Sequence, residues 1–206
     1  VASSKAPTPL FQAIATSVLL EKFQPTTEDE VNRFILTLSN KQCLLDPIPT
    51  WLLKKISSFI APVLVKLFNK SLLSGKVPLI YKSSYVTPLI KKSTLDPADV
   101  NLYRPISNLS VFSKLLERLV LSRVLAHLEQ YNLLPLHQSA YRRHHSTETV
   151  VLRVSSDLLQ AADDDELSQL VLLDLSAAFD AVDHRILLKR LEASFGLKTV
   201  VLEWFG

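Results

Sequence analysis

Apolar residues recur at helical spacing in several stretches of the chain, and the first clear one is TTEDEVNRFILTLSN, residues 26–40. Its apolar positions lie three and four residues apart, at Val31, Phe34, Ile35 and Leu38. Residues with this spacing share one face of an α-helix. Thr27 and Glu30 have the spacing of a capping box, so a helix is predicted to begin here.

Further helices are predicted downstream, and proline and glycine mark some of their ends. The stretch DPIPTWLLKKI, residues 46–56, is a turn that leads into a short helix. A second amphipathic helix is predicted over 61–75, with Pro62 in its first turn and Gly75 at its C-terminal end. Three more helices are predicted over 110–131, 147–162 and 177–194.

Two regions have the pattern of β-strands instead. SYVTPLIKK and NLYRPISNL, residues 84–92 and 101–109, flank the turn-rich STLDPAD and so predict a hairpin. QLVLLDL, residues 169–175, is a short apolar run after an acidic turn, which is typical of a buried central strand. The order of helices, hairpin, helices, strand and helix predicts an α+β fold.

The composition of the 206 residues, 48% of them hydrophobic, is ample for a core. The single cysteine, Cys43, excludes an internal disulfide framework and favours an intracellular location, nuclear or cytoplasmic. No apolar run approaches a membrane span and the 206 residues contain no signal peptide, so no membrane partner is expected. A chain without methionine that starts at Val1 is predicted to be a piece of a longer reading frame.

The net charge of +3 is unevenly distributed along the chain. Residues 76–143 hold 10 Lys and Arg against 4 Asp and Glu, whereas residues 144–206 hold 5 against 11. A basic segment followed by an acidic one suits an anion-binding region that precedes a metal-binding region, although an ordinary solvated surface explains the same pattern.

Asp174 directly follows four apolar residues in LVLLDLSAAFDAVDH, residues 170–184. At the end of a rigid strand, a carboxylate without a nearby Cys or His partner suits a hard, oxygen-preferring cation such as Mg²⁺. Alternatively, Asp174 or Ser176 caps the helix that follows. The residues by themselves leave both interpretations open.

The same stretch resembles the first catalytic motif of reverse transcriptases of non-LTR retrotransposons, the long interspersed element type. Four other stretches resemble that family in the correct order: DPIPTWLLKK, VTPLIKK, YRPISNLSVFSKLLERLVLSRV and LLPLHQSAYRRHHSTETV. Five ordered matches over about residues 40–206 are far more specific than one. The resemblance implies a right-hand polymerase fold with a helical leader over 1–40, fingers over 41–165 and the start of the palm over 166–206.

For the acidic segment, the resemblance implies a two-metal site. Asp174 would be a shared ligand of two Mg²⁺ ions, and the backbone carbonyl of Leu175 would add another ligand. Ala178 and Phe179 would lie at the nucleotide, with the Phe179 ring excluding a 2′-hydroxyl. A helix-face core position is the alternative for Phe179. Asp180 and Asp183 match the family too, but a structural role near a helix start is favoured for both.

For the basic segment, the resemblance implies contacts to deoxynucleoside triphosphate, RNA template and DNA primer. Lys91, Lys92 and Arg104 would contact the triphosphate, where arginine supplies a planar fork for phosphate oxygens. For the lysines, a place at an exposed hairpin tip is an equal alternative. Arg142 and Arg143 would contact the template–primer backbone or the triphosphate. The loop residues His137, His144 and His145 lack regular metal-ligand spacing, and the acidic run Asp163–Glu166 is predicted to be a solvated turn.

The chain departs from the family pattern in one important respect. The second carboxylate pair of the family lies on a Tyr-x-Asp-Asp hairpin, and the 206 residues contain no such sequence. The predicted function is therefore that of a reverse transcriptase fragment, inactive by itself. The alternatives are a non-catalytic RNA-binding module from a decayed or domesticated element, and a helical scaffold without a nucleic-acid role. Protein partners are not predicted.

Overall fold

The computed structural model describes residues 9–11, 13–15, 17–175 and 178–206. About half of the described chain is helical, and it also contains one two-stranded antiparallel sheet. In chain order the elements are α1 (Glu28–Leu36), α2 (Thr50–Lys55), α3 (Ser57–Ser74), α4 (Leu79–Lys82), β1 (Ser84–Ile90), the 3₁₀ helix η1 (Val100–Leu102), β2 (Tyr103–Leu109), α5 (Val111–Gln130), α6 (Thr147–Asp163), α7 (His184–Phe195) and α8 (Thr199–Trp204).

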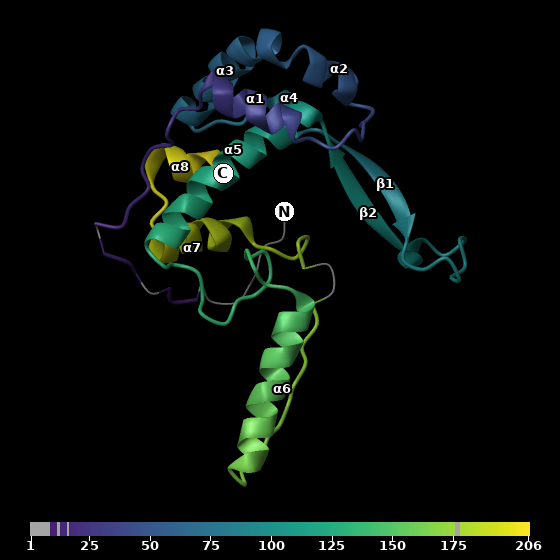
Figure 1. The fold of residues 1–206 in the computed structure, drawn as a ribbon, viewed down its shortest axis with the longest axis vertical. Helices are drawn as coiled ribbons and strands as arrows, with labels where there is room; N and C mark the ends of the chain where they lie inside the picture. The colour runs from purple at the N-terminus through teal and green to yellow at the C-terminus, as the bar shows by residue number, and fades with distance from the viewer. Residues whose placement is uncertain (1–8, 12, 16, 176–177) are drawn as a thin grey trace.

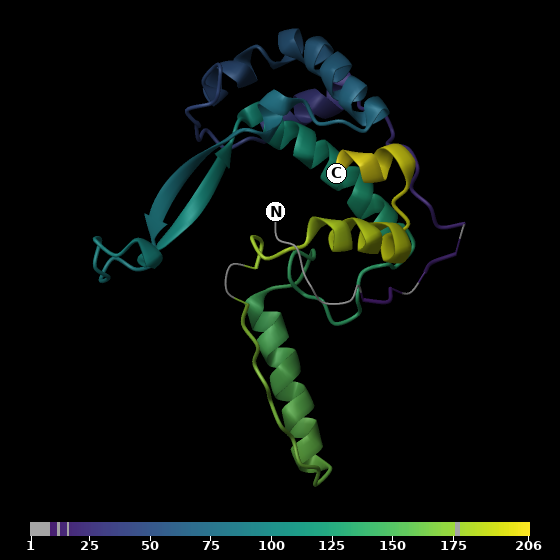
Figure 2. The ribbon, with the colours of Figure 1, turned by 180° about the vertical axis from the view of Figure 1, so that it is seen from behind.

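The helices form a body from which two parts project (Figure 1). α1, α2 and α3 pack over the first half of α5, while α7 and α8 lie near its second half. The β1–β2 hairpin extends from one end of this body. α6 extends in another direction, and the chain after it returns along the helix, as the view from behind also shows (Figure 2).

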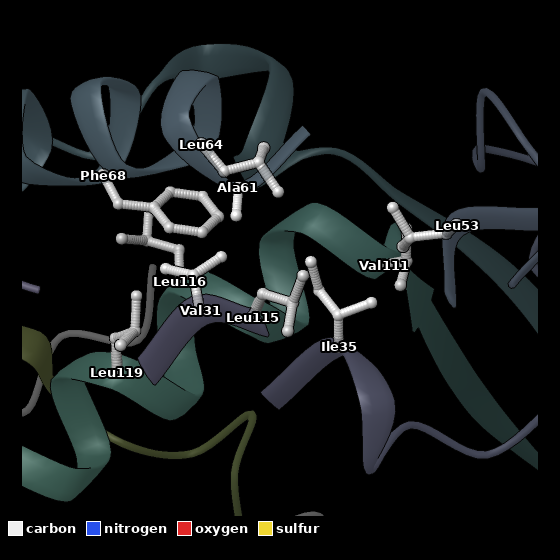
Figure 3. Packing of buried hydrophobic residues seen from close by; sticks show 10 residues of the cluster. All are labelled: Val31, Ile35, Leu53, Ala61, Leu64, Phe68, Val111, Leu115, Leu116 and Leu119. Atoms are coloured by element: carbon white, nitrogen blue, oxygen red, sulfur yellow. The ribbon is translucent and has the colours of Figure 1, made fainter. Parts of the chain in front are cut away.

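The main core lies between α1, α2, α3 and α5 (Figure 3). Ile35, Phe68 and Leu115 are completely buried there, because apolar residues three and four positions apart on each helix face the same interior. The ten buried residues of this cluster are Val31, Ile35, Leu53, Ala61, Leu64, Phe68, Val111, Leu115, Leu116 and Leu119.

A second cluster joins parts of the chain that are far apart in sequence. Phe23 and Leu72 pack there with Val120, Leu197 and Val201. Leu20 and Leu197 form a parallel bridge, in which the Leu20 N–H donates to the Gly196 carbonyl at 2.9 Å. The described residues before α1 thus contribute to the core although they form no helix.

The helix ends confirm some sequence signals and correct others. The Thr27 hydroxyl caps α1 by accepting from the Glu30 N–H, and Gly75 ends α3 in a left-handed conformation with φ of 64°. The Glu30 side chain does not complete the predicted capping box. Its carboxylate bonds instead to Arg123 and to the Thr26 hydroxyl. Since α3 begins at Ser57, Pro62 lies beyond its first turn.

Two predictions for the acidic segment are wrong in this structure. Residues 166–175 form neither helix nor strand, and their apolar side chains are exposed, with Leu173 at 90%. A buried strand needs hydrogen-bonded neighbours, and none of the described residues supplies one. The following helix begins at His184 rather than near 177, after a turn over 178–181.

The predicted combination of helices with a small sheet is confirmed. The long helix over 110–131, the helix near 147–162 and the hairpin match α5, α6 and β1–β2 within one or two residues. In the part of the chain that the structure describes, no helix is both long and apolar enough to cross a bilayer.

An ion pair that sequence patterns did not predict ties α5 to α1. The Arg123 guanidinium donates to both Glu30 carboxylate oxygens, with 2.6 Å from Nη2 to Oε2, and its Nε donates to the Gln24 carbonyl at 3.3 Å. Both side chains of the pair are about 15% exposed. The Arg123 hydrogen bond, helped by the Thr26 hydroxyl, holds the pKa of Glu30 below its usual value.

We expect Arg123→Gln to lower the free energy of unfolding by about 2 kcal/mol at neutral pH, because it leaves a largely buried carboxylate unpaired. Since the folded-state pKa of Glu30 is lowered, the pair stabilises the fold above the unfolded-state pKa near 4.5 and loses this effect as pH falls through the folded value. Urea unfolding at neutral and acidic pH measures the difference.

The matched control is Arg185→Gln. The Arg185 side chain is 77% exposed and forms an ion pair with Asp183. The substitution should change the free energy of unfolding by no more than about 0.5 kcal/mol. Equal effects of the two substitutions would contradict the importance of the Arg123–Glu30 pair.

Candidate active site and nucleic-acid surfaces

Asp174 lies in the extended segment that returns from the tip of α6, and it is exposed. Leu175 beside it is exposed as well. The proposal that Asp174 caps the next helix is wrong, because the N-cap of α7 is Asp183, nine residues further along. Ser176, the other capping candidate, lies outside the described residues. The carboxylate of Asp174 is therefore accessible for a role outside secondary structure.

The turn between Asp174 and α7 contains the residues expected at the nucleotide. Ala178 is exposed and the Phe179 side chain is 82% exposed, which contradicts the core interpretation of Phe179. The structural role favoured for Asp183 is confirmed, since its Oδ1 accepts from the Arg185 N–H at 2.9 Å and the Ile186 N–H at 3.2 Å. Asp180 is exposed in the turn, and its role stays a prediction.

The hairpin places Arg104 and Lys91 on the same face. Arg104 is paired with Leu89 in the antiparallel register, so their side chains point to one side. The Lys91 N–H donates to the Leu102 carbonyl at 2.8 Å, which extends this register by one pair and puts Lys91 on the Arg104 side. Lys92 follows the bend at Lys91 and lies outside the paired strands. All three basic residues are exposed.

The loop between α5 and α6 carries the other basic residues that the sequence indicated. The Arg142 guanidinium donates to the carbonyls of Pro135 and Gln138, at 3.2 and 3.3 Å, so it closes its own loop. Arg143 is exposed. Both line a groove of about 770 Å³ against the second half of α5, together with His144 and His145.

The acidic run at the tip of α6 is an exposed turn, as predicted. Asp163 ends the helix, and the Asp164 carboxylate accepts from the Gln160 amide at 3.1 Å. Among the described residues, no group of three or more His, Cys, Asp and Glu side chains could hold a metal ion. Neither this turn nor His137, His144 and His145 forms such a group.

The comparison with protein families settles what these motifs belong to. Residues 90–205, more than half of the chain, match the family model described as reverse transcriptase (RNA-dependent DNA polymerase). The chain belongs to the reverse transcriptase family.

Three relatives of this reverse transcriptase chain come from mobile elements of Drosophila. The probable RNA-directed DNA polymerase from transposon BS of Drosophila melanogaster is 42% identical over 45% of this chain and 10% of its own length. The RNA-directed DNA polymerase from mobile element jockey of Drosophila funebris is 32% identical over 78% of this chain and 18% of its own length. The probable RNA-directed DNA polymerase from transposon X-element of Drosophila melanogaster is 30% identical over 85% of this chain and 19% of its own length.

These matches confirm the resemblance to reverse transcriptases of non-LTR retrotransposons that the five motifs indicated. This reverse transcriptase chain spans less than a fifth of the length of each of these relatives. The family match begins at residue 90, yet the main core also contains residues of α1, α2 and α3. The helices before the matched segment are therefore part of the same packed body.

The structure keeps the two groups of candidate residues of the reverse transcriptase apart. Lys91, Lys92 and Arg104 belong to the hairpin, whereas Asp174, Ala178 and Phe179 belong to the segment between α6 and α7, which lies apart from the hairpin (Figure 1). Sequence reasoning also missed Asp46, whose carboxylate accepts from backbone N–H groups of Cys43 and Val111. The Asp-Pro dipeptide signals a turn there, but not its distant partner.

The shared face of Lys91 and Arg104 leads to a test that separates the two lysines. In a chimeric polymerase, this chain would replace the matching segment of the X-element protein. Because charge-assisted contacts to phosphate are strong, Lys91→Ala should raise the KM for deoxynucleotide about tenfold, and Arg104→Ala by about ten- to a hundredfold. Lys92→Ala is the matched control and should raise it by less than about threefold. Equal effects of both lysines would contradict the assignment by face.

Proposed function

We propose that this chain forms the fingers region and the beginning of the palm in an RNA-directed DNA polymerase of a non-LTR retrotransposon. Its substrates would be an RNA template, a DNA primer and deoxynucleoside triphosphates. The observation that carries the proposal is the position of Asp174 within the matched segment, in the sequence of the family's first catalytic motif. The accessible carboxylate in the structure is compatible with that role.

Asp174 and the Leu175 carbonyl would supply oxygen ligands of the kind that Mg²⁺ prefers. A single carboxylate does not hold two ions, and the described residues contain no ready cluster. We therefore assign Asp174 as one ligand of a site whose other carboxylates would come from the Tyr-x-Asp-Asp hairpin of the family. When bound, the ions would stabilise the charge that develops as the primer 3′-oxygen bonds to the α-phosphorus and the α–β phosphoanhydride bond breaks to release pyrophosphate.

The residues of this chain would bind and orient the nucleotide. Arg104 and Lys91 on one hairpin face would hold the triphosphate, and Phe179 would lie against the sugar. Both groups would have to approach each other, because the hairpin and the segment between α6 and α7 lie apart here. Arg143 and the groove beside it would contact the nucleic-acid backbone, where positive charge gives binding that weakens with salt.

Primer extension tests the proposal. The 206-residue chain should bind a primer–template in a salt-sensitive manner but add no nucleotide with Mg²⁺ or Mn²⁺, because one carboxylate cannot assemble the two-metal site. The chimeric polymerase should extend the primer. Extension by the chain alone that disappears with Asp174→Asn would refute the inactive-fragment assignment. Binding without extension by the chimera would favour an RNA-binding module instead.

A further inference from the structure

A small loop before α2 is attached to the junction between the hairpin and α5. Within this loop, Cys43 and Asp46 bond to each other twice: the Asp46 N–H donates to the Cys43 carbonyl at 3.0 Å, and the Cys43 N–H donates to Asp46 Oδ2 at 2.7 Å. The second oxygen, Oδ1, accepts from the Val111 N–H at 2.6 Å. Asp46 therefore joins the loop to the first residue of α5, 65 positions away.

The same loop also contacts the end of β2. The Cys43 Sγ lies 3.5 Å from the Asn108 carbonyl, on the other side of the Leu109–Ser110 junction. Asn108 in turn reaches across the hairpin, where its Nδ2 donates to Thr87 Oγ1 at 3.0 Å and to the Tyr85 carbonyl at 3.3 Å. The contacts thus extend from Asp46 through Cys43 and β2 to β1.

The position of this loop matters because the strands are exposed along most of their length. The hairpin projects from the helical body and is held at its base (Figure 1). Arg104 lies five residues from the end of β2, roughly 17 Å along an extended strand. A small change in angle at the base would therefore displace Arg104 by several times more than it displaces Asn108.

We propose that Asp46 is a positioning residue that sets the direction of the hairpin and, through it, the place of Arg104 at the nucleotide triphosphate. The inference rests on the proposed polymerase function. The Asp46 carboxylate accepts from the Val111 N–H on the α5 side of the Leu109–Ser110 junction and from the N–H of Cys43, whose Sγ contacts the β2 side at Asn108. An ionised acceptor makes such hydrogen bonds stronger. The carboxylate also complements the positive N-terminal end of α5, where the Ser110 hydroxyl accepts from the Ser113 N–H.

The first test uses the 206-residue chain and measures hydrogen exchange at the Val111 amide. Asp46→Asn keeps the size of the side chain but loses its charge and one acceptor oxygen, so exchange should become about tenfold faster. Asp96→Asn is the matched control, since the Asp96 carboxylate accepts only the Ala98 N–H within its own turn among the contacts of the described residues. Unchanged exchange at Val111 in Asp46→Asn would overturn the inference.

The second test measures nucleotide addition by the chimeric polymerase. Asp46→Ala should raise the KM for deoxynucleotide about tenfold, with kcat changed by less than about twofold. The KM of Asp46→Asn should lie between the KM of Asp46→Ala and that of the unsubstituted chimera. In a polymerase that already carries Arg104→Ala, Asp46→Ala should raise the KM further by less than about twofold, because its effect depends on Arg104.

The outcomes separate this inference from the function on which it rests. The positioning role alone would be overturned if Asp46→Ala still raised the KM tenfold in the Arg104→Ala polymerase. It would also be overturned if Asp46→Ala raised the KM no more than Asp96→Ala does. An unchanged KM in Arg104→Ala itself would overturn the assignment of Arg104 to the triphosphate, and the inference with it. Melting curves of each variant distinguish misfolding from a changed KM.

Discussion

The chimeric polymerase should lose template-directed nucleotide addition when Asp174 is replaced by asparagine, with kcat falling at least about a thousandfold. The substitution keeps the size of the side chain but removes the negative charge that would hold a divalent ion. Because Asp174 is exposed and caps no helix, the substitution should leave the melting temperature of the chain unchanged. Single-nucleotide addition under saturating substrate measures the effect.

The matched control is Asp164→Asn, which alters an aspartate in the exposed turn ten residues earlier. Its carboxylate bonds only to Gln160 among the contacts of the described residues, and an amide oxygen can accept the same bond. We expect nearly unchanged kcat. Similar losses for both aspartates would show that the metal-ligand assignment of Asp174 is wrong, and that general negative charge in this segment matters instead.

Phe179→Val should relax the choice between ribo- and deoxynucleotides in the same chimera. If the ring occupies the space of a 2′-hydroxyl, the smaller side chain removes a steric clash, and use of ribonucleotides relative to deoxynucleotides should rise by about 10- to 100-fold. The structure adds a second expectation. A ring that is 82% exposed leaves no cavity when shortened, whereas loss of a buried phenylalanine costs about 3–5 kcal/mol.

The measurement is the ratio of kcat/KM values for a matched ribo- and deoxynucleotide pair, with a melting curve for each variant. Leu172→Ala shortens another exposed apolar side chain of the same segment and should leave the ratio unchanged. An unchanged ratio in Phe179→Val together with a lower melting temperature would return Phe179 to a packing role.

The elements predicted correctly from sequence are those that local interactions define. The apolar repeat from Val111 to Val124 is sufficient to predict α5, and the turn residues between two β-rich stretches predict the hairpin. Gly75 ends α3 because only glycine adopts its left-handed conformation easily. In each case the decisive residues lie within about 20 positions of one another.

Several of the errors concern features that depend on distant partners, whereas the start of α7 depends on a local cap. The apolar run before Asp174 has the composition of a strand, but a strand forms only where a neighbour accepts its backbone hydrogen bonds. The start of α7 was misplaced because Asp183, rather than an earlier residue, supplies the cap. The Asp46–Val111 and Arg123–Glu30 contacts cross 65 and 93 positions, which periodicity cannot reveal.

Of the candidate site, residue types and their order could be predicted, but their arrangement could not. Sequence alternation gives the shared face of Lys91 and Arg104 only once the hairpin register is known, and the register comes from the structure. For Phe179, the sequence allows either a nucleotide contact or a core position. The structure places this residue in an exposed turn.

The bridge between Leu20 and Leu197 has a consequence for folding during synthesis. The second core cluster cannot close until α8 has left the ribosome, because Leu197 and Val201 supply part of it. At roughly 5–20 residues per second, the chain between the two bridge partners takes about 10–35 s to make. Phe23 remains uncovered for nearly all of this time, and Leu72 and Val120 remain uncovered from the moment each is made, so the nascent body is an expected substrate for chaperones.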